Sequence, residues 1–385
     1  MAEWIDCKIA DLGTVIGGAT PSTKKLEYYE NGSIAWITPK DLSTFRGRYI
    51  RRGERYITEL GLKSCSTQLL PKNTVLFSSR APIGYIAIAE NELCTNQGFK
   101  SVIPNENTDP LFLYYLFKYN KNKIEGMGSG TTFKEVSGNT MKNIVVSVPR
   151  DKKVQEQISS ILGAIDNKIE SNEKINNNLE HQAQAIFKNS FVDFSPFDGI
   201  QPHSWTISSL GAITNMVAGG DKPKVISTIQ TEACPYPIYA NGLRENGLYG
   251  YTNTPKICDE SVTVSARGTV GFVCIRHTPY VPIVRLVALI PNIELVSVKY
   301  LYLYLKQLNI TGTGTTQQQL TIPDFKKTPI LIPDKETMSK FTNVITPLFL
   351  KIWANEKENS KLLALRDTLL PQLMSGKLEV SEINI

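Results

Sequence analysis

Arginine residues are concentrated in one short stretch of the amino-terminal half of the chain, with two tyrosines among them. Residues 46–63 hold six basic residues, opposed only by Glu54 and Glu59, and Tyr49 and Tyr56 lie among them. Guanidinium groups bond phosphate oxygens and the base edge of guanine, so this composition suits contact with nucleic acid. Taken alone, the same residues are equally consistent with a solvated basic face.

Catalytic chemistry is not indicated anywhere in the sequence. There is no Asn-Pro-Pro-aromatic motif of an amino-methyltransferase, no Walker A sequence and no nuclease-type carboxylate cluster followed by lysine. Glycine-rich residues 126–130 follow a predicted helix rather than a strand, which favours a flexible loop over a nucleotide site. A loop that approaches the DNA backbone with Thr131, Thr132 and Lys134 is a further possibility. The three histidines stand apart, so we expect no metal site, cofactor or catalytic residue in this chain.

The elements that must position the basic residues occur twice. Residues 78–88, with Arg80, recur as residues 265–275, with Arg267. Four further pairs recur in the same order, namely 9–13 with 207–211, 17–21 with 219–223, 113–118 with 301–306, and 128–132 with 312–316. Chance explains one such match but not an ordered series, so the chain is predicted to be an internal duplication.

Each copy begins as a globular segment. Short apolar runs such as residues 33–37 and 74–77 are interrupted by proline and glycine, which is typical of strands in a mixed α+β domain. Residues 110–119 and 297–307 are rich in leucine and aromatic side chains, and each predicts one short helix.

Each copy ends in a long amphipathic pattern with alternating four-residue and three-residue spacing. The core positions that it predicts are Ile158, Ile161, Ile165, Lys168, Asn172, Ile175, Leu179, Gln182 and Ile186 in the first copy, and Phe341, Ile345, Leu348, Ile352, Asn355, Asn359, Leu362, Arg366, Leu369 and Leu373 in the second, with Gly376 as a stop. Two such helices of roughly 35 residues, about 50 Å long, predict an antiparallel coiled coil whose buried asparagines fix the register. Such a spacer would suit two groove contacts about a DNA turn or more apart, where one turn is roughly 34 Å. Two helices that pack separately on their own domains are the alternative.

Length and composition fit a soluble protein of several domains. The chain has 385 residues, 41% hydrophobic residues and a net charge of +6. We expect four segments, with globular domains at 1–150 and 193–335 and spacer helices at 151–192 and 336–385. Scattered cysteines, the absence of a signal peptide and the absence of a membrane-spanning run favour a cytoplasmic protein without a membrane partner.

The ordered set of motifs resembles the specificity subunit of type I restriction-modification systems, over essentially the whole chain. The resemblance is carried by Leu12-Gly13 with Gly17-Gly18, by Phe77-Ser78-Ser79-Arg80 up to Gly84, by Thr95-Asn96-Gln97-Gly98-Phe99, and by the ending Leu369-Leu370-Pro371-Gln372-Leu373-Met374-Ser375-Gly376-Lys377-Leu378. No single motif is as specific for a family as a set of zinc ligands would be. The occurrence of all these motifs in this order is highly specific.

The resemblance implies that each globular segment is a target recognition domain for one half of a bipartite sequence in double-stranded DNA. It implies that the helices carry two methyltransferase subunits, with restriction subunits joining the larger complex. S-adenosylmethionine, ATP and Mg²⁺ would then belong to those partners, and this chain would not be an enzyme. A scaffold whose domains bind protein instead of DNA is the alternative.

We expect the residues that select the DNA sequence to lie where the two copies differ. Residues 36–42 and the arginine-rich stretch of the first copy are replaced by residues 236–249 in the second. The DNA contacts that we predict are Lys40, Arg46, Arg48, Arg51 and Arg52 in the first copy and Asn241, Arg244, Asn246, Tyr249 and Lys256 in the second. Arg80 and Arg267 are common to both copies, so they would anchor phosphate or hold the fold. Gln317, Gln318 and Gln319 could contact bases, although a solvated loop is favoured.

Overall fold

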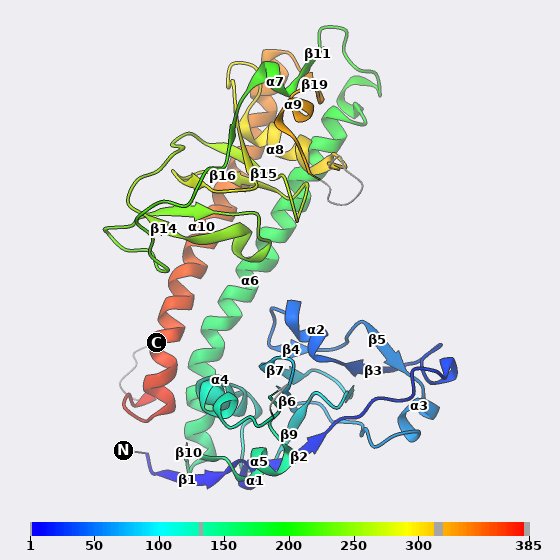
Figure 1. Ribbon diagram of the computed structural model, residues 1–385, viewed down its shortest axis with the longest axis vertical. Helices are drawn as coiled ribbons and strands as arrows, with labels where there is room; N and C mark the ends of the chain where they lie inside the picture. Colours follow the sequence, from blue (N-terminus) through cyan, green and yellow to red (C-terminus); the bar gives the residue numbers. More distant parts are fainter. Residues whose placement is uncertain (1, 131–133, 312–318, 381–385) are drawn as a thin grey trace. The chain divides into compact units, whose positions relative to one another are not determined.

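The computed structural model describes residues 2–130, 134–311 and 319–380, and the chain divides into two compact units (Figure 1). Unit 1 comprises Met1–Glu173 with Glu356–Ile385, and unit 2 comprises Lys174–Asn355. The units cross the four predicted segments because each long helix contributes one half to each unit. The predicted loop residues Thr131 and Thr132, the repeat 312–316, Gln317 and Gln318 lie outside the described residues.

The globular part of unit 1 is a mixed α+β domain. Its described strands are β1 (Trp4–Lys8), β2 (Gly13–Gly17), β3 (Ile34–Ile37), β4 (Tyr49–Ile50), β5 (Arg55–Ile57), β6 (Val75–Ser79), β7 (Ile83–Ala89), β8 (Cys94–Thr95), β9 (Lys100–Pro104) and β10 (Val145–Pro149). They form a β1-β10 pair, a sheet of order β2-β9-β6-β7-β4 and a sheet of order β5-β3-β8. The helical elements are α1 (Ile9–Leu12), η1 (Leu26–Tyr28), α2 (Pro39–Thr44), α3 (Glu59–Lys63), α4 (Pro110–Gly126) and α5 (Gly138–Asn143).

The globular part of unit 2 repeats this plan. Its described strands are β11 (Thr206–Ser209), β12 (Thr214–Ala218), β13 (Tyr236–Tyr239), β14 (Leu248–Thr252), β15 (Ser261–Ser265), β16 (Val273–Arg276), β17 (Val281–Pro282), β18 (Leu286–Pro291) and β19 (Pro329–Ile332). They form a β11-β19 pair, a sheet of order β12-β18-β15-β16 and a sheet of order β14-β13-β17. The helical elements are η2 (Ser195–Phe197), α7 (Leu210–Ile213), η3 (Arg244–Gly247), α8 (Val298–Gln307) and α9 (Ile322–Phe325).

The duplication is visible in how the strands pair. In each unit the three-stranded sheet joins one antiparallel and one parallel neighbour to its middle strand, β3 in unit 1 and β13 in unit 2. The larger sheets also correspond strand for strand, except that unit 1 adds β4 in parallel to the edge strand β7. The arginine-rich stretch of the first copy therefore supplies an additional edge strand.

One buried helix in each unit covers the larger sheet (Figure 1). Asp109 caps α4 by accepting a hydrogen bond from the amide of Phe112, and Ser297 caps α8 by accepting one from Tyr300. Both helices bury most of their leucine and aromatic side chains in the core of their unit. Tyr115 and Tyr300 are fully buried.

The long helices α6 (Lys152–Phe191) and α10 (Lys335–Met374) lie antiparallel in each unit. In unit 1, Asn172 donates hydrogen bonds of 2.8 Å to Glu358 and to Asn359. In unit 2, Asn355 donates one of 2.8 Å to Asn176. The repeat that carries Asn172 onto Asn355 also carries Asn176 onto Asn359, so the same polar pair occurs once per unit. The predicted coiled coil with buried asparagines is confirmed.

Asn172 is buried as predicted, but the predicted core positions Lys168, Ile175 and Gln182 of α6 are exposed, so the prediction is wrong at these three positions. Lys168 has a half-exposed side chain and pairs with Glu358, whereas Ile169 is buried. Ile175 is likewise exposed, and Ala183 and Phe187 are buried rather than their predicted neighbours. The buried positions still follow steps of three and four residues, but a step of four stands where a step of three was predicted, and the reverse. Both orders of steps give the same average period, so the sequence pattern does not distinguish them. None of the described helices is sufficiently long and apolar to cross a membrane.

The end of α10 depends on a glycine, as the sequence predicts. Gly376 has a φ of +69°, and a β-carbon there would lie 2.6 Å from the indole nitrogen of Trp4. We expect Gly376→Ala to destabilise unit 1 by about 1–2 kcal/mol, because the left-handed conformation and the contact both oppose a side chain. Urea denaturation tests this. Gly126→Ala is the matched control because a β-carbon there meets nothing within 4 Å, and an equal loss in both variants would contradict the expectation.

Candidate nucleic-acid interface

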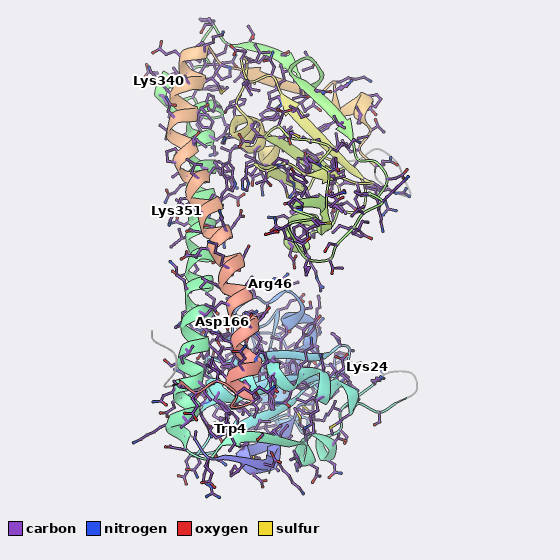
Figure 2. All side chains as sticks on the ribbon, turned by 90° about the vertical axis from the view of Figure 1, so that its left-hand side faces the viewer. Trp4, Lys24, Arg46, Asp166, Lys340 and Lys351 are labelled. Carbon is purple, nitrogen blue, oxygen red and sulfur yellow. The ribbon has the colours of Figure 1, made fainter. Side chains whose placement is uncertain are left out.

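The exposed basic residues of unit 1 gather around α2, β4 and the following loop. Arg46, Arg51 and Arg52 are exposed, and so is Lys40, which lies 2.8 Å from Glu54 in a solvent-exposed ion pair. Figure 2 labels Arg46, which lies in the same unit as the labelled Asp166 of α6. Exposed guanidinium groups that are not committed to buried partners suit phosphate and base contacts.

Two shallow cavities make this surface concave. One of about 560 Å³ is lined by Ser33, Ala35, Arg51, Arg52, Tyr56 and Asn91. The other, of about 320 Å³, is lined by Lys40, Asp41, Ser43, Thr44, Phe45, Ile50, Arg52, Gly53 and Glu54. Arg52 lines both, so three of the predicted contact residues are brought to adjoining hollows.

The loop that carries these arginines is held on α2 by one carboxylate. Asp41 accepts hydrogen bonds of 2.7 Å from the backbone amides of Thr38 and Glu54. The first bond caps the helix, and the second ties down the loop between β4 and β5. A β-carbon on Gly53 would lie 2.8 Å from the Asp41 carboxyl carbon, so this close approach requires glycine.

Arg48 does not belong to the exposed set, so the prediction that it contacts DNA is wrong. Its side chain is only 4% exposed, and its guanidinium points to α6, where it bonds Glu170, Asn167 and the carbonyl of Gly163. Burial alone lowers the pKa of Arg48, but the hydrogen bond and charge of Glu170 raise it above its usual value. The side chain is thus a buried cation bound to the helix.

Arg80 and Arg267 lie in the repeated turn, and the main chain of each forms a β-bridge to a distant segment. Arg80 bridges the backbone of Glu135, and its guanidinium lies 3.4 Å from the Glu135 carboxylate. Arg267 bridges the backbone of Gln319, and its carbonyl accepts a 2.7 Å hydrogen bond from Asn241. The side-chain amide of Asn241, which was predicted to contact a base, is therefore bonded within the domain.

The remaining predicted residues of unit 2 are exposed. Arg244 and Asn246 lie in η3, Tyr249 lies on β14, and Lys256 follows it and donates to the carbonyl of Ala218. Lys222 was not predicted, although its ammonium lies 4.3 Å from the centre of the Tyr249 ring. The signal for it was the repeated segment 219–223, in which the second copy has a basic residue and the first has Thr20.

A second residue that the sequence did not single out is Arg276, which supports the η3 loop. It is 5% exposed, stacks 3.6 Å from the Tyr239 ring centre and donates a 2.7 Å hydrogen bond to the carbonyl of Asn246. Glu245 and Asn246 have positive φ values of 48° and 53°. A positive φ costs energy for glutamate, and the hydrogen bond from Arg276 to the carbonyl of the adjacent Asn246 stabilises the loop in this conformation.

His277 stacks on Trp353 of α10, with ring centres 4.2 Å apart and planes at 14°. Partial burial and the charges of Lys299 and Arg276 lower the pKa of His277 below its ordinary 6.5. The folded protein then binds fewer protons than the unfolded chain, so stability is present above pH 6.5 and is lost as the pH falls through the lowered value. We expect His277→Phe, which keeps a ring, to weaken this dependence in urea denaturation between pH 7.5 and 5. An unchanged dependence would contradict the assignment.

Within residues 2–130, 134–311 and 319–380, no group of histidine, cysteine, aspartate and glutamate side chains is arranged to hold a metal ion. The chemistry that the described surfaces offer is hydrogen bonding and charge from arginine, lysine, asparagine and tyrosine.

Comparison with known proteins identifies the fold and the family. A family model described as the type I restriction modification DNA specificity domain matches residues 1–181 and 202–364. The specificity subunit of the type I restriction enzyme MjaIX of Methanocaldococcus jannaschii is 35% identical over 99% of this chain and 95% of its own length. The HindI specificity subunit of Haemophilus influenzae is 24% identical over 98% of this chain and all of its own length.

A solved structure agrees at the level of the fold. The crystal structure of a type I restriction-modification S subunit from M. genitalium superposes with a TM-score of 0.62 at 18% identity, covering 97% of this chain and 96% of that one. The two matched segments of the family model correspond to the duplicated halves described above. This chain therefore belongs to the type I restriction-modification DNA specificity family.

Proposed function

We propose that this chain is the non-catalytic subunit that selects the DNA sequence for a type I restriction-modification complex. The domain of unit 1 contacts one half of a bipartite duplex target, and the domain of unit 2 contacts the other. The observation that carries the proposal is one framework of sheets that occurs twice with unlike polar surfaces. Lys40, Arg51 and Arg52 line hollows in unit 1, whereas unit 2 presents Arg244, Asn246 and Tyr249.

The side chains on these surfaces suit base recognition. Arginine can bond the O6 and N7 of guanine, asparagine can bond the N6 and N7 of adenine, and exposed lysine contacts phosphate. Unlike surfaces on a shared framework support two different half-sites. Arg80 and Arg267 are common to both copies, so they would not distinguish the two half-sites.

The helices α6 and α10 are proposed to dock two methyltransferase subunits, with restriction subunits joining the larger assembly. Both helices keep exposed apolar side chains, among them Ile175, Val344, Leu350, Leu363 and Leu365. Figure 2 shows Lys340 and Lys351 on α10 of unit 2, and both are exposed. In this scheme S-adenosylmethionine, ATP and Mg²⁺ act in the partner subunits, where methylation and cleavage take place.

A salt titration of duplex binding tests the proposal. The chain, reconstituted with its methyltransferase partner, is mixed with randomised duplex DNA, and bound molecules are sequenced at several salt concentrations. We expect a bipartite consensus and an affinity that falls steeply with salt, by roughly 0.9 log units per log unit of salt for each phosphate contact. Binding without sequence preference, or none at all, would favour a protein scaffold instead.

A further inference from the structure

We propose that Arg48 and Glu170 position the recognition loop of unit 1 on α6, and that His277 and Trp353 position the recognition domain of unit 2 on α10. These residues would set base preference without contacting DNA. The inference rests on the proposed function, and it assigns a specificity role to side chains that join each recognition domain to a long helix.

The contacts of Arg48 are more numerous than an ordinary surface ion pair provides. Nε lies 3.0 Å and Nη2 lies 3.4 Å from the two carboxylate oxygens of Glu170, while Nη2 also bonds Asn167. Nη1 donates to the carbonyl of Gly163 at 3.4 Å. A planar guanidinium can reach acceptors on these three residues at once, whereas the compact ammonium of lysine cannot hold the same bidentate geometry.

The helix is shaped to receive this side chain. Gly163 lies under the guanidinium, and a β-carbon there would lie 3.4 Å from Nη1 of Arg48 and 3.0 Å from Leu111. One turn away on α6, Asp166 accepts hydrogen bonds from Arg366 and from Tyr115. Asp166 therefore has its own partners, which leaves Glu170 as the carboxylate that pairs with Arg48.

The backbone connects Arg48 directly to the proposed DNA-contacting residues. The Arg48 carbonyl accepts a 2.7 Å hydrogen bond from the amide of Ile88 on β7. The next two residues of the chain form β4, which pairs in parallel with β7. Arg51 and Arg52 come next in the chain and line the hollows described above. The side chain of Arg48 thus fixes this edge of the sheet to α6, and the exposed arginines depend on that edge for their position.

Unit 2 makes its contact at the equivalent point of its own helix with different chemistry. The repeat that carries Asn172 onto Asn355 carries Glu170 onto Trp353. The His277 ring stacks on Trp353, and the Lys299 ammonium lies 5.3 Å from its ring centre. His277 directly follows Arg276, which bonds the η3 loop that presents Arg244 and Asn246.

One helical position therefore receives the recognition domain in each unit, through an ion pair in unit 1 and a ring stack in unit 2. Base contacts demand placement to within about half an ångström. Changing either pair should alter the base preference of one half-site, and the other half-site should be unaffected because its contact is chemically independent.

The test compares Arg48→Met with Arg150→Met in the complex reconstituted with its methyltransferase partner. Arg150 is the matched control because it is also an arginine of unit 1 in an ion pair, with Glu3, but it is 63% exposed. Selection from randomised duplex DNA reports the base preference of each half-site, and a salt titration reports the number of phosphate contacts. Arg48→Lys and Glu170→Gln are added, since Glu170→Gln keeps the shape of the contact if Arg48→Met fails to fold.

We expect Arg48→Met to reduce discrimination in one half-site by roughly tenfold or more, without changing the salt slope. Glu170→Gln should relax the same half-site, Arg48→Lys should have an intermediate effect, and Trp353→Leu should relax only the other half. Arg150→Met should retain both preferences.

A salt slope reduced by about one in Arg48→Met but unchanged in Glu170→Gln, which keeps Arg48, would mean that Arg48 itself contacts a phosphate, which would overturn the positioning role but leave the proposed function intact. Lower thermal stability with unchanged preferences would overturn it as well. A wild-type complex without sequence preference would remove the proposed function, and the positioning role would fall with it.

Discussion

Arg366→Met is expected to lower the free energy of unfolding of unit 1 by about 3–5 kcal/mol. Arg366 lies 2.9 Å from the carboxylate of Asp166, whose side chain is 7% exposed. Removing the cation leaves a buried carboxylate whose remaining side-chain partner is the hydroxyl of Tyr115, at 2.7 Å. Urea denaturation measures the loss. The contacts join α4, α6 and α10, so the loss should extend over the whole unit.

The control is Arg150→Met, which removes an exposed ion pair and should cost less than about 1 kcal/mol. The double variant Arg366→Met/Asp166→Asn should recover part of the stability, because it removes both charges of the buried pair. Equal losses for Arg366→Met and Arg150→Met would show that the buried pair does not hold the helices in unit 1.

Replacing Arg51 and Arg52 with alanine should have the largest effect on DNA binding. A side chain that bonds a base contributes about 1–3 kcal/mol of discrimination, and one that bonds phosphate contributes about 0.9 to the salt slope. Both arginines are exposed and line the hollows of unit 1. We expect weaker binding, a shallower salt dependence, and a relaxed preference at one half-site. A mobility-shift titration at several salt concentrations measures the first two effects.

The control Arg150→Ala removes one exposed positive charge from the same unit, and Arg150 does not line the hollows. It should leave both affinity and salt slope close to those of the unchanged chain. An unchanged slope in the Arg51/Arg52 variant would argue that the basic residues around the hollows form a solvated face.

The duplication and the helix pair could be predicted from sequence because both depend on patterns that span many residues. Recurring segments such as residues 78–88 and 265–275 gave the repeated framework, and sustained spacing gave the long helices. Which side chains of α6 face α10 was harder to predict. Lys168 and Ile169 satisfy the same average period, and only packing against α10 decides which is buried.

The contact residues were harder to predict for a different reason. Arg48 and Arg51 belong to one basic stretch, yet one points into the protein and the other outward. In an irregular loop no periodicity separates these directions, and the acceptor of Arg48 lies far away in sequence, on α6. Arg276, on strand β16, was missed because its acceptor, the carbonyl of Asn246, lies far away in sequence in η3.

The central claim is that each unit selects one half of a bipartite DNA target. The most direct test is selection from randomised duplex DNA by the complex with its methyltransferase partner, comparing the unchanged chain with Arg51→Ala/Arg52→Ala and with Arg244→Ala/Asn246→Ala. The account predicts a two-part consensus in which each variant relaxes a different half and retains the other. A single continuous consensus, or loss of both halves in either variant, would contradict it.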